Sequence, residues 1–247
     1  MFRGIYKIVS NKPLTKDVFE MILSGDTSAI TAPGQFINIK LDGFYLRRPI
    51  SICDYDNNTV TILYKVVGGG TEAMSRLESG AELDILCGLG NGFDVSKSGE
   101  KPVLIGGGVG VPPLYNLCKK LIESGKKVTV ILGFNTASEV FYKEKFESLG
   151  AEVYVSTVDG SSGVKGFVTD VLKNIDYDYF FTCGPMPMFR AIEKIASSSG
   201  QYSFEERMGC GFGACMGCSC KTKYGNKRIC RDGPVLEREE IQWETLK

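Results

Sequence analysis

Four cysteines near the end of the chain constrain its fold more than any other feature. Cys210, Cys215 and Cys218 follow a C-x4-C-x2-C spacing, and Cys230 supplies a fourth thiolate after a short polar stretch. Thiolates are soft anionic donors that suit iron held with bridging sulfide, and this spacing is the plant-type pattern for a [2Fe–2S] cluster. Glycines between the cysteines suit a loop that turns backbone N–H groups toward sulfur. We therefore expect these four cysteines to bind a [2Fe–2S] cluster.

Two other uses of the cysteines remain open at this point. Structural zinc also takes four thiolates, as in a nonenzymatic adaptor, but it usually pairs two C-x2–4-C elements. Disulfides belong to oxidising compartments, and nothing else in the sequence indicates one. Cys220 is an extra thiol that could replace Cys218, but it breaks the x2 spacing, and we expect it not to bind iron.

The composition narrows the class of protein. Lysine plus arginine equals aspartate plus glutamate, 29 against 29, so no overall field favours nucleic acid. No apolar run approaches the ~20 residues that cross a bilayer. An odd number of cysteines, nine in all, most of them scattered, is typical of a reducing compartment. We expect a cytoplasmic protein that binds neither nucleic acid nor membrane.

The sequence contains no histidine. This absence excludes Rieske ligation, histidine-dependent catalytic triads and histidine metal sites. It is compatible with hydride and electron transfer, in which a cofactor performs the chemistry.

Residues 1–97 have the pattern of a closed antiparallel β-barrel. Apolar and polar side chains alternate in short segments, which turn residues such as Pro33-Gly34 separate. Only Thr71–Glu78 looks helical there. The expected strands are Gly4–Ser10, Val18–Leu23, Gln35–Leu41, Ser51–Asp54, Thr59–Val66 and Glu82–Leu86.

Two stretches of this barrel favour phosphate and flavin binding. Arg47–Ile52 reads R-R-P-I-S-I and offers a forked guanidinium and a hydroxyl, although alone it is more often a solvated arginine pair beside an edge proline. Val66–Glu72 places three glycines before a helix, where free N–H groups attract anions. Leu63–Lys65 lies between them, and its Tyr64 could stack on a flavin ring. Together they predict a flavin site.

Residues 98–199 change to alternating strands and helices, after a polar, turn-rich boundary at 91–102. This rhythm predicts βαβ units around a parallel sheet. The expected strands are Pro102–Gly106, Lys127–Gly133, Ala151–Thr157 and Tyr177–Cys183. The first expected helix follows the glycine loop and ends at Glu123. The other expected helices cover Ser138–Leu149, Gly166–Asn174 and Pro187–Ser197.

A glycine loop at 106–110 follows the first of these strands and leads into a helix, the context of a dinucleotide site. It does not match G-x-G-x-x-G/A, so a simple tight turn stays open. Thr182–Pro187 ends another strand at the same sheet edge, where ligands bind. Cys183 would lie near a nicotinamide there, or be a small buried apolar residue. The candidate nucleotide contacts are Gly107, Gly108, Gly110, Cys183, Gly184 and Pro185.

These motifs together resemble a known family. R-P-I-S, G-G-G-T, G-G-G-V-G-V-P-P and C-G-P resemble the ferredoxin–NADP reductase superfamily. With C-G-F-G-A-C-M-G-C and R-I-C-R-D-G-P, nearly the whole chain is similar to the electron-transfer subunits of type B dihydroorotate dehydrogenase. The resemblance implies an FAD-binding barrel (1–97), an NAD-binding α/β domain (98–199) and a small [2Fe–2S] domain (200–247).

The resemblance also implies a function and a set of contacts. Such a subunit oxidises NADH and passes electrons to the FMN of a separate catalytic subunit, in a heterotetramer of two of each, in pyrimidine (UMP) biosynthesis. The implied FAD contacts are Arg48, Pro49, Ile50, Ser51, Leu63, Tyr64, Lys65, Gly70 and Thr71. Cys210, Cys215, Cys218 and Cys230 would hold the iron.

One related class gives an alternative function. The small subunit of an NADH-dependent ferredoxin:NADP reductase has a similar layout, but typically has aspartate where Cys210 stands. A ferredoxin or small-acceptor reductase, or a diaphorase subunit, is therefore the second hypothesis. For the nucleotide, Ser156–Ser162 offers hydroxyls and an acid, which favours NAD(H) over NADP(H), although Lys143 and Lys145 lie on a nearby expected helix.

Overall fold

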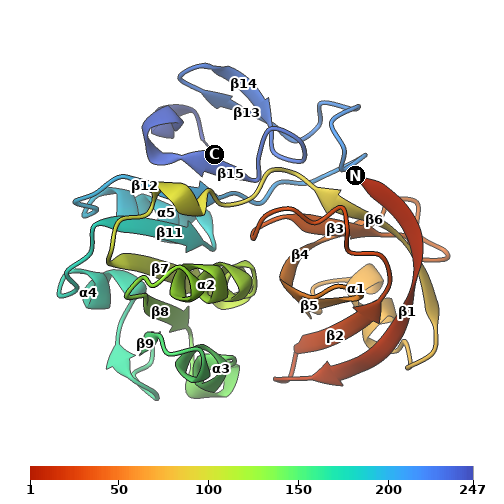
Figure 1. The fold of residues 1–247 in the computed structure, drawn as a ribbon, viewed down its shortest axis with the longest axis horizontal. Coiled ribbons are helices and arrows are strands. Elements are labelled where there is room, and N and C mark those ends of the chain that lie inside the picture. The colour runs from red at the N-terminus through yellow and green to blue at the C-terminus, as the bar shows by residue number, and fades with distance from the viewer. Residues whose placement is uncertain (247) are drawn as a thin grey trace.

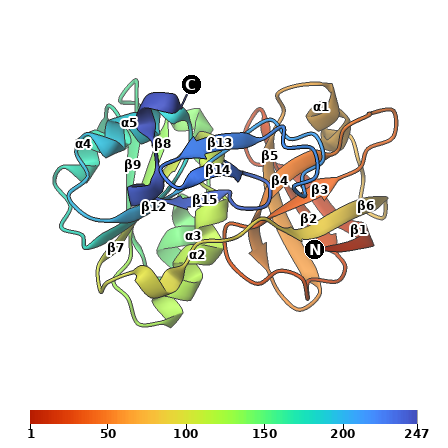
Figure 2. The same cartoon turned by 90° about the horizontal axis from the view of Figure 1, so that it is seen from above.

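The computed structural model describes residues 1–246, which form three regions (Figure 1). A β-barrel at the N-terminus lies beside an α/β region, and the C-terminal segment crosses above both (Figures 1 and 2). No helix in residues 1–246 is long and apolar enough to cross a membrane.

The barrel closes from six antiparallel strands in the order β1-β2-β5-β4-β3-β6. Alternating side chains fill its interior, as in β2, where Met21 and Leu23 are fully buried. One short helix, α1 (Gly69–Ser75), follows β5. The strands are β1 (Phe2–Pro13), β2 (Val18–Ser24), β3 (Phe36–Ile39), β4 (Arg48–Tyr55), β5 (Thr59–Lys65) and β6 (Glu82–Leu89). The predicted barrel and its six strands are confirmed.

The α/β region is built on a seven-stranded sheet in the order β10-β9-β8-β7-β11-β12-β15. All neighbours are parallel except β15, which runs antiparallel to β12. The strands are β7 (Pro102–Gly107), β8 (Thr129–Phe134), β9 (Glu152–Thr157), β10 (Val164–Lys165), β11 (Tyr179–Cys183), β12 (Gly200–Ser203) and β15 (Val235–Glu237). The helices are α2 (Pro113–Glu123), α3 (Lys143–Ser148), α4 (Val168–Leu172) and α5 (Met186–Glu193). The predicted parallel sheet is confirmed.

One predicted helix is wrong. The expected helix at 138–149 is split into a 3-10 turn at Ala137–Glu139 and the short α3. Tyr142 lies between them with a φ of 66°, a left-handed conformation that no α-helix contains. Both Phe141 and Tyr142 are buried, so tertiary packing overrides the helical pattern here.

The two large regions share an apolar core. Barrel residues Val18, Cys53 and Leu63 belong to the same buried cluster as Leu117 and Phe146 of the α/β region. Burying this surface between the two regions is favourable by the hydrophobic effect, and it holds the barrel against the sheet. The interface fixes the position of any ligand bound between them.

The C-terminal segment leaves the sheet and returns to it. Residues 204–234 connect β12 to β15, and they contain the hairpin β13 (Ser219–Thr222) and β14 (Gly225–Arg228). Two short 3-10 turns, Arg238–Glu240 and Trp243–Thr245, follow β15. We call residues 204–234 the cluster segment, since all four candidate iron ligands lie in it (Figure 2).

Candidate flavin, nucleotide and iron–sulfur sites

A cavity of about 360 Å³ opens at the barrel strands β4 and β5. These strands are antiparallel neighbours, so the two predicted motifs meet in one wall. The wall contains every predicted flavin contact except Gly70, namely Arg48, Pro49, Ile50, Ser51, Leu63, Tyr64, Lys65 and Thr71.

The two adjacent arginines have different roles. Arg47 is held in the barrel, because its Nη2 donates to Oδ1 of Asp84 at 2.9 Å and its Nη1 to the Asp84 carbonyl at 2.8 Å. The guanidinium of Arg48 lies 4.9 Å over the Phe44 ring and in the cavity wall. A forked donor placed there suits the pyrophosphate of a dinucleotide.

Gly70 lies beneath this guanidinium. A Cβ added at Gly70 would lie 2.0 Å from Nε of Arg48, so glycine leaves the guanidinium room to lie in this position. Thr71 fixes the turn before the helix, because its Oγ1 accepts from Val67 N–H at 2.9 Å and donates to the Gly68 carbonyl at 3.0 Å. The residues present therefore fit an anionic cofactor.

Tyr64 corrects one expectation. Its ring is 1% exposed and stacks on Phe19 with centroids 5.8 Å apart, and its hydroxyl donates to Asn11 at 2.8 Å. The ring therefore belongs to the barrel core and is not open to stack on a flavin. The residue still forms part of the cavity wall.

A second cavity, of about 600 Å³, lies at the carboxyl edge of the parallel strands. Ligands of open α/β sheets bind at this edge. Its wall contains five of the six predicted nucleotide contacts: Gly107, Gly108, Gly110, Gly184 and Pro185.

The glycine loop in this wall depends on two glycines for different reasons. Gly108 has a φ of 54°, which favours glycine. A Cβ on Gly110 would lie 2.3 Å from the carbonyl oxygen of Cys183, so the loop packs directly against the end of β11.

Ser156 and Cys183 differ in their availability to a ligand. The Ser156 hydroxyl is buried in this wall and has no hydrogen-bond partner within residues 1–246, as expected of a group that a ligand completes. Cys183 is buried and outside the wall, and burial strongly raises the pKa of its thiol. Its expected place near the nicotinamide stays a prediction.

The two cavities meet at three residues. Lys65, Val109 and Glu205 line both. Desolvation by the surrounding protein raises the pKa of Glu205, although its side chain is open to the cavities. The sequence interpretation missed Val109 and Glu205. A strand assignment at Gly200–Ser203 would have revealed Glu205, because the residue lies just past the end of that strand at the same sheet edge.

The four candidate iron ligands form two pairs. The N–H of Cys215 donates to Sγ of Cys210 at 3.4 Å, and the N–H of Cys230 donates to Sγ of Cys218 at 3.4 Å. A two-iron cluster requires two thiolates on each iron, which this arrangement fits. Within residues 1–246, no three acidic or cysteine side chains converge on a site for a single metal ion.

Backbone N–H groups surround the first ligand. Burial raises the pKa of Cys210, but hydrogen bonds from Phe212, Cys215 and Ala214 outweigh it and lower the pKa to about 6. N–H groups that point at sulfur stabilise anionic thiolates and tune a cluster. Cys210 is partly exposed and Cys215 is exposed, whereas Cys218 and Cys230 are buried.

Cys220 lies apart from these pairs. It is in β13, where its register partner is Lys227, and it is buried. All nine cysteines are free thiols in the structure. That Cys220 binds no iron stays a prediction.

The fold and these sites define a class of protein, the oxidoreductases with a flavin-binding barrel and a nucleotide-binding α/β domain. Residues 104–194 match the oxidoreductase NAD-binding domain, and residues 205–242 match the iron–sulfur cluster binding domain of dihydroorotate dehydrogenase B. A solved NADH-dependent reduced ferredoxin–NADP oxidoreductase is similar over 98% of this chain and 91% of its own, with a TM-score of 0.89 and 28% identity. The ferredoxin NADP⁺ reductase of Neisseria gonorrhoeae shares the fold over 82% of this chain and 99% of its own (TM-score 0.69, 16% identity).

Curated relatives identify the family. The dihydroorotate dehydrogenase B (NAD⁺) electron transfer subunit of Bacillus mycoides is 45% identical over 95% of this chain and 96% of its own. That of Fusobacterium nucleatum is 44% identical over 96% of this chain and 97% of its own. The chain belongs to the family of dihydroorotate dehydrogenase B electron transfer subunits.

Proposed function

We propose that this chain carries electrons between NAD(H) and the FMN of a dihydroorotate dehydrogenase catalytic subunit, through FAD and a [2Fe–2S] cluster, in pyrimidine biosynthesis. One observation carries the proposal. The nucleotide and flavin cavities share Lys65, Val109 and Glu205, and Met208 and Pro234 of the cluster segment line the flavin cavity. Three cofactor sites are thus adjacent in one chain.

Each site has its own set of residues. Arg48, Ser51 and Thr71 offer polar contacts to FAD, with Pro49, Ile50, Leu63, Tyr64 and Lys65 in the wall and Gly70 behind Arg48. Gly107, Gly108, Gly110, Gly184 and Pro185 receive NAD(H), with Cys183 behind them. Cys210, Cys215, Cys218 and Cys230 hold the iron.

The bound cofactors supply the chemistry, since a flavin exchanges hydride with nicotinamide and single electrons with an iron–sulfur cluster. The chain provides position and environment. Arg48 neutralises phosphate charge, and the bare backbone at Gly108 lets a nucleotide approach the sheet edge. Glu205 places an acidic group with a raised pKa where the two ligands meet.

NAD(H) is the proposed nucleotide. The two lysines that could attract a 2′-phosphate are engaged elsewhere, because Lys143 pairs with Glu147 at 2.8 Å and Lys145 with Glu20 at 2.9 Å. Ser156 instead offers a hydroxyl in the cavity wall. The names of the relatives, which specify NAD⁺, support the same choice.

The partner is the catalytic subunit, and the exposed face of the cluster segment is its proposed docking surface. Phe212, Met216 and Tyr224 of this segment are exposed, as is Cys215. Large apolar side chains on a surface indicate a protein contact. Two copies of each subunit in a cytoplasmic heterotetramer are the proposed assembly.

We keep the proposed division into domains at 1–97, 98–199 and 200–247. The last boundary falls within one sheet, since β12 and β15 extend the nucleotide-binding sheet. The cluster-binding unit is therefore attached through shared strands.

Co-expression with an FMN-containing catalytic subunit tests the function. The complex should reduce NAD⁺ with dihydroorotate, whereas the chain alone should reduce dyes with NADH and leave dihydroorotate unchanged. A chain that binds no catalytic subunit and reduces ferredoxin by itself would contradict the proposal.

That outcome would favour the second candidate, a ferredoxin or small-acceptor reductase. The likeness to the reduced ferredoxin–NADP oxidoreductase over nearly the whole chain supports it. Cys210 favours the first candidate, since its Sγ accepts N–H donors as a ligand thiolate does.

A further inference from the structure

The cluster segment is fastened to the barrel as well as to the sheet from which it emerges. Its two ends continue into β12 and β15, which pair with each other at the edge of the nucleotide-binding sheet. That connection alone would tie the cluster to the nucleotide-binding region. Two asparagine side chains of the barrel and of its exit make a second connection.

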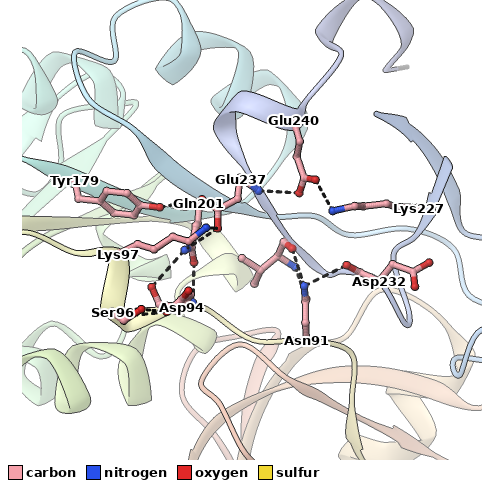
Figure 3. A network of polar contacts seen from close by, with 11 residues as sticks. Asn91, Asp94, Ser96, Lys97, Tyr179, Gln201, Lys227, Asp232, Glu237 and Glu240 are labelled. Carbon is pink, nitrogen blue, oxygen red and sulfur yellow. Dashed lines mark hydrogen bonds and ion pairs between the residues drawn. The ribbon is translucent and has the colours of Figure 1, made fainter. Parts of the chain in front are cut away.

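Asn91, just past β6, binds the strand that follows the last ligand (Figure 3). Its Nδ2 donates to the carbonyls of Asp232 at 3.1 Å and Val235 at 3.0 Å, and its Oδ1 accepts from the Val235 N–H at 3.1 Å. Its own N–H donates to the Gly233 carbonyl at 2.7 Å. All these partners are backbone groups within five residues after Cys230.

Asn38, on β3, binds the loop that carries the first ligand. Its side chain is almost fully buried, and Nδ2 donates to the carbonyl of Cys210 at 3.3 Å. Gly211 has a φ of 77°, and a Cβ there would lie 2.3 Å from Nδ2 of Asn38. In the barrel, the register partner of Asn38 is Pro49, which lines the flavin cavity.

Other polar contacts of the region serve different connections. In the linker between the barrel and β7 (residues 90–101), Asp94 N–H donates to Gln201 at 2.9 Å and Lys97 pairs with Glu237 at 2.8 Å, and these contacts hold the linker against the sheet (Figure 3). Lys227 pairs with Glu240 and ties the hairpin to the C-terminal turn. Among residues 1–246, only these two asparagines join the barrel or its exit, through side-chain hydrogen bonds, to an iron ligand or to residues within five of one.

We propose that Asn38 and Asn91 are positioning residues, which make the barrel the common frame of the flavin and the cluster and so set their separation. The inference rests on the proposed function. A functional site must be held closely by its supporting residues, and the rate of electron transfer falls as the separation between donor and acceptor grows, so residues that fix this separation act on that rate. The two asparagines hold the segment near its first and last ligand, which fixes both its distance and its tilt.

The test compares two half-reactions in the purified chain with both cofactors bound. Stopped-flow loss of flavin absorbance measures electron entry from NADH, and rapid-freeze EPR measures arrival at the cluster. Asn91→Asp keeps the size and the acceptor but replaces two donated hydrogen bonds with repulsion between oxygens. Asn91→Ala removes all three side-chain bonds, and Asn38→Ala removes one. Asn58→Ala, in an exposed turn, is the control.

We expect flavin reduction by NADH within about twofold of the parent chain, and cluster reduction slowed severalfold in both Asn91 variants. Backbone hydrogen exchange at residues 230–236 should accelerate in the same variants. A merely structural role would slow both half-reactions together. Unchanged cluster reduction, or an equal loss in both half-reactions, would overturn the inference.

Two further outcomes are separable. If an Asn91 variant failed to retain its cluster, the inference would be tested in Asn38→Ala, which loses a single hydrogen bond. The same two rates, flavin reduction and cluster reduction, would then be compared. If the parent chain itself transferred no electrons from NADH to the cluster, the proposed function would fail, irrespective of the asparagines.

Discussion

The hydroxyl of Tyr142 in the nucleotide-binding region donates a hydrogen bond of 2.6 Å to Oε2 of Glu20 in the barrel. Lys145 pairs with the same carboxylate at 2.9 Å and lies 4.5 Å over the Tyr142 ring. Tyr142 adopts its left-handed conformation at this contact. Strain held at one residue indicates that its surroundings determine its position, so this contact helps to define how the two regions meet.

Removing the Tyr142 hydroxyl should lower the stability of the folded chain. In Tyr142→Phe, the ring still packs, but a part-buried carboxylate loses one donor, which should cost about 1–2 kcal/mol in the free energy of unfolding by denaturant. Tyr154→Phe is the matched control, because Tyr154 binds Glu152 at an exposed site and should change stability by less than about 0.5 kcal/mol. Equal effects would contradict the assigned role of Tyr142.

Gly70→Ala should weaken FAD binding. Its Cβ would displace the Arg48 guanidinium, and loss of that phosphate contact should raise the Kd for FAD roughly tenfold, measured by fluorescence titration of the flavin-free chain. Gly69→Ala is the control, since its Cβ would meet Phe44 at an ordinary 3.6 Å. If both variants bound FAD as the parent does, Arg48 would not be the phosphate contact.

NADH should be preferred over NADPH. Because Lys143 and Lys145 are held by carboxylates, no lysine of α3 is free to receive a 2′-phosphate. The KM for NADPH should therefore exceed that for NADH severalfold in dye reduction assays, and equal values would argue against this interpretation of the site.

Asp84 should give the barrel an acid-sensitive stability. Hydrogen bonds from Arg3 and then Arg47 lower its pKa from 3.8 to about 2, against the opposing effect of burial. The folded pKa lies below the unfolded value, so the stabilisation is complete above about pH 4 and is lost as the pH falls toward 2. Asp84→Asn should cost about 1 kcal/mol at neutral pH.

The unfolding midpoints of the parent and Asp84→Asn chains, compared by fluorescence, should therefore converge as the pH falls through that window. Because acid removes the cluster from both chains alike, the measurement is the difference between their unfolding midpoints at each pH. If the difference between the two unfolding midpoints stayed constant as the pH fell, the charge of Asp84 would not contribute to the stability of the barrel.

The sequence predicted the local features well because periodicity and turn residues are local signals. The expected strand Thr59–Val66 forms β5, and the cysteine spacing alone indicated the four candidate ligands, which the structure arranges in two pairs. The helix expected at 138–149 was wrong because Tyr142 responds to Glu20, which lies 122 residues away. Local propensity contains no information on such a contact.

The connections between sites were beyond sequence reasoning for the same reason. Asn38 is a polar residue of the expected strand Gln35–Leu41 and Asn91 belongs to the turn-rich boundary at 91–102, and their partners lie 172 and up to 144 residues further along the chain. Glu205 was missed because the short strand β12 has only four residues and begins with glycine. Tyr64 was expected to stack on a flavin because its sequence neighbours suggested a site, whereas the strand pleat turns its ring inward.

The most direct measurement of the central claim is EPR of the anaerobic purified chain after NADH is added as the sole reductant. Electron transfer within one polypeptide predicts that NADH bleaches the flavin and also produces a [2Fe–2S] signal, with about two irons per chain. A bleached flavin without a cluster signal, in a sample that contains zinc in place of iron, would contradict it.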